Sequence, residues 1–123
     1  MPYLLVALGS AIGGVSRFAL GSWILRQYGS FIPWNTLAIN VFGSVLIGLF
    51  ATAVRPAPWR QFLIVGICGG FTTFSSFSLE TLNLFRDGHP GRSLAYIGLS
   101  VGVCLIGVWA GHLAGTALAG GGD

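Results

Sequence analysis

Four long stretches of this chain contain almost no charged residues, and this pattern sets tight limits on the fold. They cover approximately residues 2–25, 34–54, 58–85 and 93–118. Each reaches the roughly 20 apolar residues that a helix needs to cross a membrane. Charged side chains make up only 7% of the 123 residues, against about 25% in soluble domains. We therefore predict one all-α membrane domain over residues 1–123, with four transmembrane helices in these stretches.

The same scarcity of charge excludes several classes of function. The six arginines are scattered and there is no lysine, so the sequence does not indicate nucleic-acid binding. The chain has no paired carboxylates, no nucleophile beside a base and no phosphate-binding glycine loop. We therefore predict that the protein is not an enzyme.

The arginines in the predicted loops leave the orientation of the protein in the membrane weakly specified. Four crossings place both termini on one side, together with Arg55 and Arg60, while Arg26, Arg86 and Arg92 lie on the other. A bias of one charge is small for the positive-inside rule. Two interpretations remain open: one weakly specified orientation, or insertion in both orientations.

Residues 69–78, GGFTTFSSFS, lie in the middle of the third apolar stretch and form poor helix. A helix broken inside the membrane commonly forms an ion site, because its freed backbone groups point into the gap. The alternative is a kinked helix whose hydroxyls bond to the preceding turn. The many Gly, Thr and Ser residues in this one stretch favour a break over a kink. Phe74 and Phe77 accompany it, either as core residues or as rings whose positive edges face an anion.

Other polar residues lie within the apolar stretches at helical spacing. Thr36 and Asn40 share one face of the second helix, and Tyr96, Ser100 and Cys104 share one face of the fourth. Each set has an alternative role in helix packing. Taken together, however, hydrogen-bond donors outnumber carboxylates, which suits a small anion better than a cation.

Arg17 and Glu80 are ionisable residues inside predicted spans, and they lie at similar depth. We expect them either to pair or to share a polar vestibule. The alternative for Arg17 is that its long side chain reaches the membrane interface.

In the first and fourth predicted helices, several glycines are spaced four residues apart, which allows neighbouring helices to pack closely. They form the pairs Gly9 and Gly13, Gly98 and Gly102, and a further series at residues 107, 111 and 115. These faces exceed the needs of one small bundle and suggest an oligomer. The alternative is that the glycines only pack the four helices within one subunit.

The sequence resembles the Fluc (CrcB-type) family of fluoride channels. The resemblance rests on GGVSR at residues 13–17, TLAINVFG at residues 36–43, and GGFTTFSSFS at residues 69–78 followed by Glu80. It implies passive, selective export of fluoride across a microbial cell membrane, the inner or plasma membrane. It also implies an antiparallel, dual-topology homodimer embedded in membrane lipid, with two pores that both subunits line.

The resemblance assigns roles to individual residues. It implies a structural sodium ion (Na+) at the dimer centre, held by the backbone carbonyls of Gly69 and Thr72. It places the following residues along the fluoride pore: Thr36, Asn40, Phe74, Ser75, Ser76, Phe77, Tyr96 and Ser100. Cys104 occupies a position where the family can carry a hydroxyl.

Two other classes of protein remain open. A small four-helix, dual-topology multidrug exporter has similar size and charge balance, but that class needs a carboxylate in the first helix, and this chain has none there. A membrane scaffold subunit that transports nothing is the second.

Overall fold

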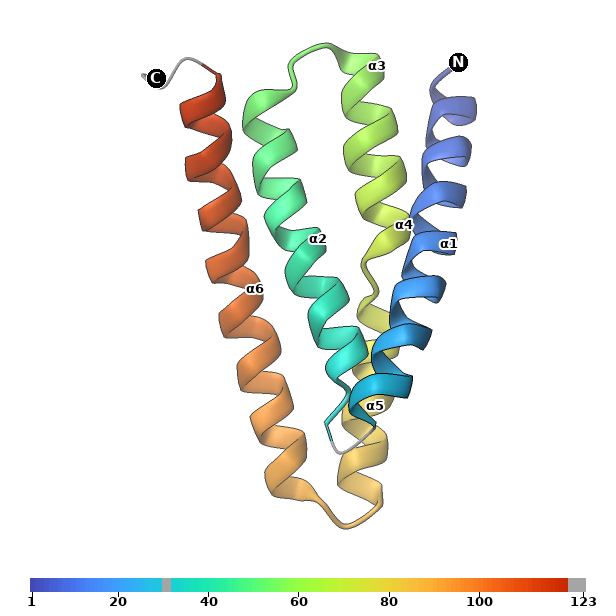
Figure 1. The fold of residues 1–123 in the computed structure, drawn as a ribbon, viewed down its shortest axis with the longest axis vertical. Coiled ribbons are helices and arrows are strands. Elements are labelled where there is room, and N and C mark those ends of the chain that lie inside the picture. The colour runs from blue at the N-terminus through green and yellow to red at the C-terminus, as the bar shows by residue number, and fades with distance from the viewer. Residues whose placement is uncertain (30–31, 120–123) are drawn as a thin grey trace.

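The computed structural model describes residues 1–29 and 32–119, which form four long helical rods side by side (Figure 1). The first two rods are α1 (Pro2–Tyr28) and α2 (Trp34–Ala53), and the last is α6 (Pro90–Leu118). The third is built from α3 (Ala57–Arg60), the π-helical segment η1 (Gln61–Cys68), α4 (Gly69–Phe71) and α5 (Phe74–Arg86). All four rods are long and apolar enough to cross a membrane. The predicted four-helix architecture is confirmed, and the N-terminus lies at the same end as the last turn of α6.

Some boundaries differ from the sequence-based expectation by a few residues. The first helix continues to Tyr28, because Arg26 is favourable near the negative end of the helix dipole and Gly29, with φ of 72°, ends the helix. The fourth begins at Pro90 instead of residue 93. Proline fits the first turn of a helix, where no backbone N–H is needed.

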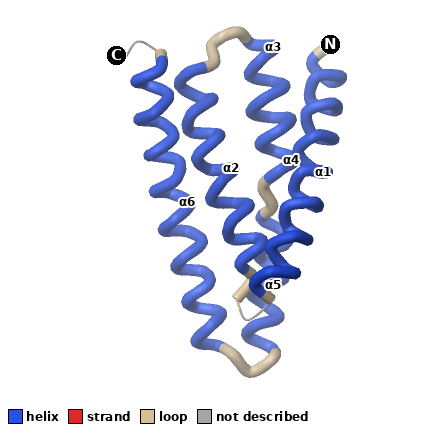
Figure 2. Tube along the Cα trace, viewed as in Figure 1, coloured by secondary structure: helices blue, strands red, loops and turns tan. Residues whose placement is uncertain are grey.

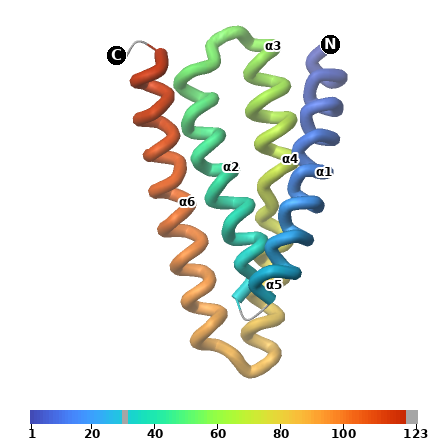
Figure 3. Tube along the Cα trace, in the orientation of Figure 1, coloured from blue at the N-terminus to red at the C-terminus, as the bar shows by residue number. Residues whose placement is uncertain are grey.

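Glycine contacts hold the rods together in two pairs, α1 with the upper part of the third rod and α2 with α6 (Figure 3). A side chain on Gly13 would overlap the carbonyl oxygen of Ile67, and one on Gly111 would overlap that of Val45. The predicted close packing is therefore real. Gly98 and Gly102 differ, since no atom of the described residues lies within 4 Å of a methyl group placed there.

The third rod is interrupted near its middle, as Figure 2 shows by the change from helix to loop below α4. Thr72 and Thr73 have extended backbones, with ψ angles of 157° and 115°. The hydroxyl of Thr73 then accepts the N–H of Ser76 at 3.2 Å and caps α5. The predicted break is confirmed, but it follows the glycines.

Gly69 and Gly70 themselves stay helical, and the small size of Gly70 allows close packing. A side chain on Gly70 would overlap the backbone of Ser10 in α1. The two β-branched threonines that follow are better suited to extended backbone.

Candidate functional site

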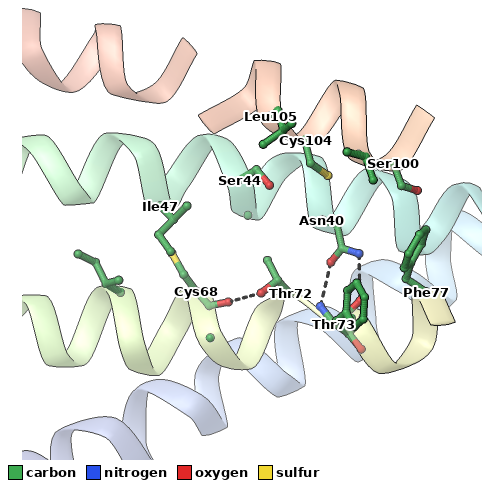
Figure 4. Close-up of a pocket in the computed structure, with 15 residues that line it drawn as sticks. Asn40, Ser44, Ile47, Cys68, Thr72, Thr73, Phe77, Ser100, Cys104 and Leu105 are labelled. Carbon is green, nitrogen blue, oxygen red and sulfur yellow. Dashed lines mark hydrogen bonds between the residues drawn. The ribbon is translucent and has the colours of Figure 1, made fainter. Parts of the chain in front are cut away.

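Asn40 of α2 fills the gap in the third rod. Its Nδ2 donates to the carbonyl of Thr73 at 3.0 Å, and its Oδ1 accepts the N–H of the same residue at 2.8 Å (Figure 4). This pair fixes the orientation of the amide and satisfies the N–H of Thr73, which the break has freed. Nδ2 carries a second hydrogen, which takes part in no hydrogen bond within the described residues.

A cavity of about 400 Å³ lies beside this junction, between α2, the third rod and α6. Figure 4 shows Asn40 and Thr73 on one side of it and α6 on the other. Its lining combines polar groups with apolar walls. The lining residues are Asn40, Gly43, Ser44, Ile47, Ile64, Cys68, Gly69, Thr72, Thr73, Phe74, Phe77, Ser100, Val101, Cys104 and Leu105. The side chains of Asp, Glu, Lys and Arg are absent from this lining.

Phe74 and Phe77 both line the cavity, but in different settings. Phe77 packs against Tyr96 with ring centroids 5.2 Å apart and joins the small buried core. Phe74 lies 5.5 Å from Phe77, centroid to centroid, yet 77% of its surface is exposed. One phenylalanine is thus anchored in the subunit, while the other projects from it.

Glu80 forms the centre of a hydrogen-bonded cluster that joins three helices. Its carboxylate accepts the hydroxyls of Thr36 and Tyr96, each at 2.9 Å. Tyr96 has no exposed surface and Thr36 only 4%. Both hydroxyls were expected along the pore, and the structure directs them to Glu80 instead of the cavity. A direct role in ion binding stays a prediction for these two residues.

Arg17 does not bind Glu80 and has another hydrogen-bond partner. Its Nε donates to the carbonyl of Gly70 at 3.2 Å, just before the break. Within the described residues no salt bridge joins Arg17 to Glu80, so the expected pairing is not seen. The reason is the fold: α1 packs against η1 and α4, whereas α5, which carries Glu80, packs mainly against α6. The two residues flank the break on opposite sides.

The carbonyls of Gly69 and Thr72 are the candidate ligands for sodium. In a continuous helix the N–H of Thr73 would bond to the carbonyl of Gly69, but here it bonds to Asn40. Within residues 1–29 and 32–119 neither carbonyl accepts a hydrogen bond across the break. Two unsatisfied carbonyl oxygens at membrane depth suit a hard cation, so these residues fit the ion.

The remaining predicted residues divide between the cavity and the cap of α5. Ser100 lines the cavity. Ser75 bonds to Thr73 through its hydroxyl at 3.2 Å, and Ser76 bonds to Thr73 through its N–H. Neither Ser75 nor Ser76 is among the lining residues, and their place in the pore stays a prediction.

Sequence reasoning missed two residues of the site. Thr73 supplies both backbone groups that bind Asn40, which only the fold could show. Ser44 also lines the cavity, and its spacing of four residues from Asn40 could have placed it on the same helix face.

Known proteins resemble this chain over nearly its whole length. The family described as "CrcB-like protein, Camphor Resistance (CrcB)" matches residues 4–112. A protein of Opitutus terrae named "Fluoride-specific ion channel FluC" is 50% identical over 94% of this chain and 93% of its own length. A protein of Rhodospirillum rubrum with the same name is 49% identical over 92% of this chain and 93% of its own length. Another with this name, from Paramagnetospirillum magneticum, is 52% identical over 94% of this chain and 96% of its own length.

Proposed function

Because this chain belongs to the CrcB family, we propose that it is a fluoride-selective channel that exports fluoride passively across the cell membrane. The names of its relatives support the choice of ion. The observation that carries the proposal is the cavity beside the break, which offers hydrogen-bond donors and no charged side chain. The free N–H of Asn40 and the hydroxyl of Ser100 would replace part of the water around fluoride, and the ring edges of Phe74 and Phe77 would add weak positive contacts.

We further propose that the channel is an antiparallel homodimer with two pores. The cavity extends to the surface of the single subunit, where Phe74 is 77% exposed. Polar groups such as those of Asn40 and Thr72 are not stable against lipid and require a protein cover. A second copy would provide it, and the open face at Gly98 and Gly102 offers further room for close contact. The nearly balanced loop arginines are compatible with insertion in both orientations.

Sodium is proposed as a structural ion of this dimer, held by the carbonyls of Gly69 and Thr72 from both copies. The ion would satisfy oxygens that lipid cannot. We expect purified protein in sodium chloride to melt at a clearly higher temperature than the same protein in N-methylglucamine chloride, since ligand binding stabilises the folded state. Equal melting temperatures at equal ionic strength would argue against a sodium site.

Replacement of Phe74 by Ile is expected to reduce fluoride efflux from liposomes by about tenfold or more, because the aliphatic side chain lacks the positive ring edge. Exposure of Phe74 means that the change should leave the subunit fold intact. A fluoride electrode measures the flux, and the exposed Phe85 provides the matched control as Phe85→Ile. Unchanged flux in Phe74→Ile would remove Phe74 from the pathway.

The wild-type protein in liposomes separates the three candidate functions. Passive fluoride release without a proton gradient is the expected result for the channel. Uptake of a cationic drug driven by a proton gradient would instead indicate an exporter. Liposomes that stay tight to fluoride would indicate a scaffold subunit.

A further inference from the structure

We propose that Ser44 of α2 is a fluoride-binding donor in the cavity that Ser100 and Cys104 of α6 also line. This inference rests on the proposed channel function and extends the pathway beyond Asn40. Ser44 belongs to none of the positions assigned from the family resemblance, and its role is argued from the cavity alone.

The two hydroxyls are free in the isolated subunit. Five other hydroxyls, on α2, the third rod and α6, donate to the carbonyl one turn earlier at 2.7–3.1 Å, which is the usual way to satisfy them in a membrane helix. Those of Ser44 and Ser100 make no such bond within the described residues. Ser100 is 94% buried, with 6% of its surface exposed, and its oxygen has no partner among the described residues. A buried hydroxyl without a partner is costly, so a ligand for it is expected.

Ser44 and Ser100 both line one cavity, Ser44 from α2 and Ser100 from α6. Figure 4 shows Ser44 one turn beyond Asn40, on the side of Cys104 that lies away from Ser100. Together with the free N–H of Asn40, they provide three neutral donors on two helices. Neutral donors at close range suit a small anion that must lose its water, since they bind it without a fixed opposite charge.

Cys104 explains why this chain needs Ser44. It follows Ser100 by one turn of α6 and lines the same cavity, but a thiol is only a weak hydrogen-bond donor. Farther along, the cavity wall becomes apolar with Ile47 and Leu105. Without Ser44, an anion moving in this direction from Asn40 would meet one weak donor and then hydrocarbon.

The test compares fluoride efflux from liposomes that contain wild type, Ser44→Ala, Cys104→Ser and the double variant Ser44→Ala/Cys104→Ser. A lost hydrogen bond to a charged group is expected to slow efflux by about tenfold in Ser44→Ala. In the double variant the new hydroxyl at position 104 should restore most of the flux. Thr116→Val serves as the control, because the Thr116 hydroxyl bonds to the carbonyl of His112 on an exposed face outside the cavity.

The outcomes separate this inference from the channel function itself. Wild-type flux in Ser44→Ala overturns the role of Ser44 and leaves the channel standing. If Ser44→Ala is slow and the double variant Ser44→Ala/Cys104→Ser is equally slow, the role of Ser44 as a donor is also overturned. Ser44 would then affect flux only by supporting the fold. Absence of flux in the wild type contradicts the channel function. If Ser44→Ala fails to assemble, Ser44→Cys replaces it: reduced flux supports the donor role, and wild-type flux overturns it.

Discussion

Replacement of Asn40 by Asp is expected to reduce fluoride efflux by about two orders of magnitude while the protein stays folded. The aspartate keeps the oxygen that accepts the N–H of Thr73, so half of the pair that holds the break remains. It loses the donor to the carbonyl of Thr73 and the second N–H, which has no partner among the described residues. A carboxylate there would also repel an anion, and like charges brought close together cost several kcal/mol.

The measurement is efflux from liposomes with a fluoride electrode, paired with gel filtration to establish that the variant assembles as the wild type does. Asn83→Asp makes the same change on an exposed position of α5 outside the cavity lining, and it should conduct like the wild type. If Asn40→Asp conducts at the wild-type rate, Asn40 has no part in ion binding and its bonds to Thr73 serve the fold alone.

The second large effect concerns stability and compares two adjacent glycines. Gly13→Ala is expected to lower the free energy of unfolding by about 1–3 kcal/mol, the usual cost of overpacking. The added methyl group would overlap the carbonyl oxygen of Ile67 and approach the backbone nitrogen of Phe71. Because these are backbone atoms, they cannot move aside without separating α1 from the third rod.

Gly14→Ala is the matched control, since no atom of the described residues lies within 4 Å of its added methyl group. In a helix, alanine is favoured over glycine by up to about 1 kcal/mol, so this variant should be as stable as the wild type or more so. Thermal or denaturant unfolding in detergent measures both. Equal stability of the two variants would contradict the packing of α1 against η1 and α4 described above.

The break in the third rod shows how far the sequence could predict the site. The run of Gly, Thr and Ser residues predicted a break and its approximate place. The exact position, Thr72 and Thr73, depended on Gly70 packing against Ser10 of α1 and on Asn40 bonding to Thr73. These partners lie 33 or more residues away in the chain, where no local propensity can identify them.

Arg17 and Glu80 make the same point about charges. Their depth in the membrane could be estimated from helix length, and that estimate suggested a pair. Depth does not determine, however, toward which neighbouring helix a side chain points. The packing of α1 against α4 brings Arg17 to the carbonyl of Gly70. Glu80 instead accepts hydrogen bonds from Thr36 and Tyr96.

By itself, the sequence determined that this protein spans a membrane four times as helices. Hydrophobic length and the absence of charge settle that, because in lipid a chain must satisfy its backbone hydrogen bonds within each segment. Which polar groups find a partner within the subunit follows from the packing of the helices in three dimensions. The hydroxyls of Thr36 and Tyr96 donate to Glu80, whereas the buried hydroxyl of Ser100 has no partner among the described residues. Whether a hydroxyl has a partner depends on helices distant in sequence, and their packing alone brings a partner within reach.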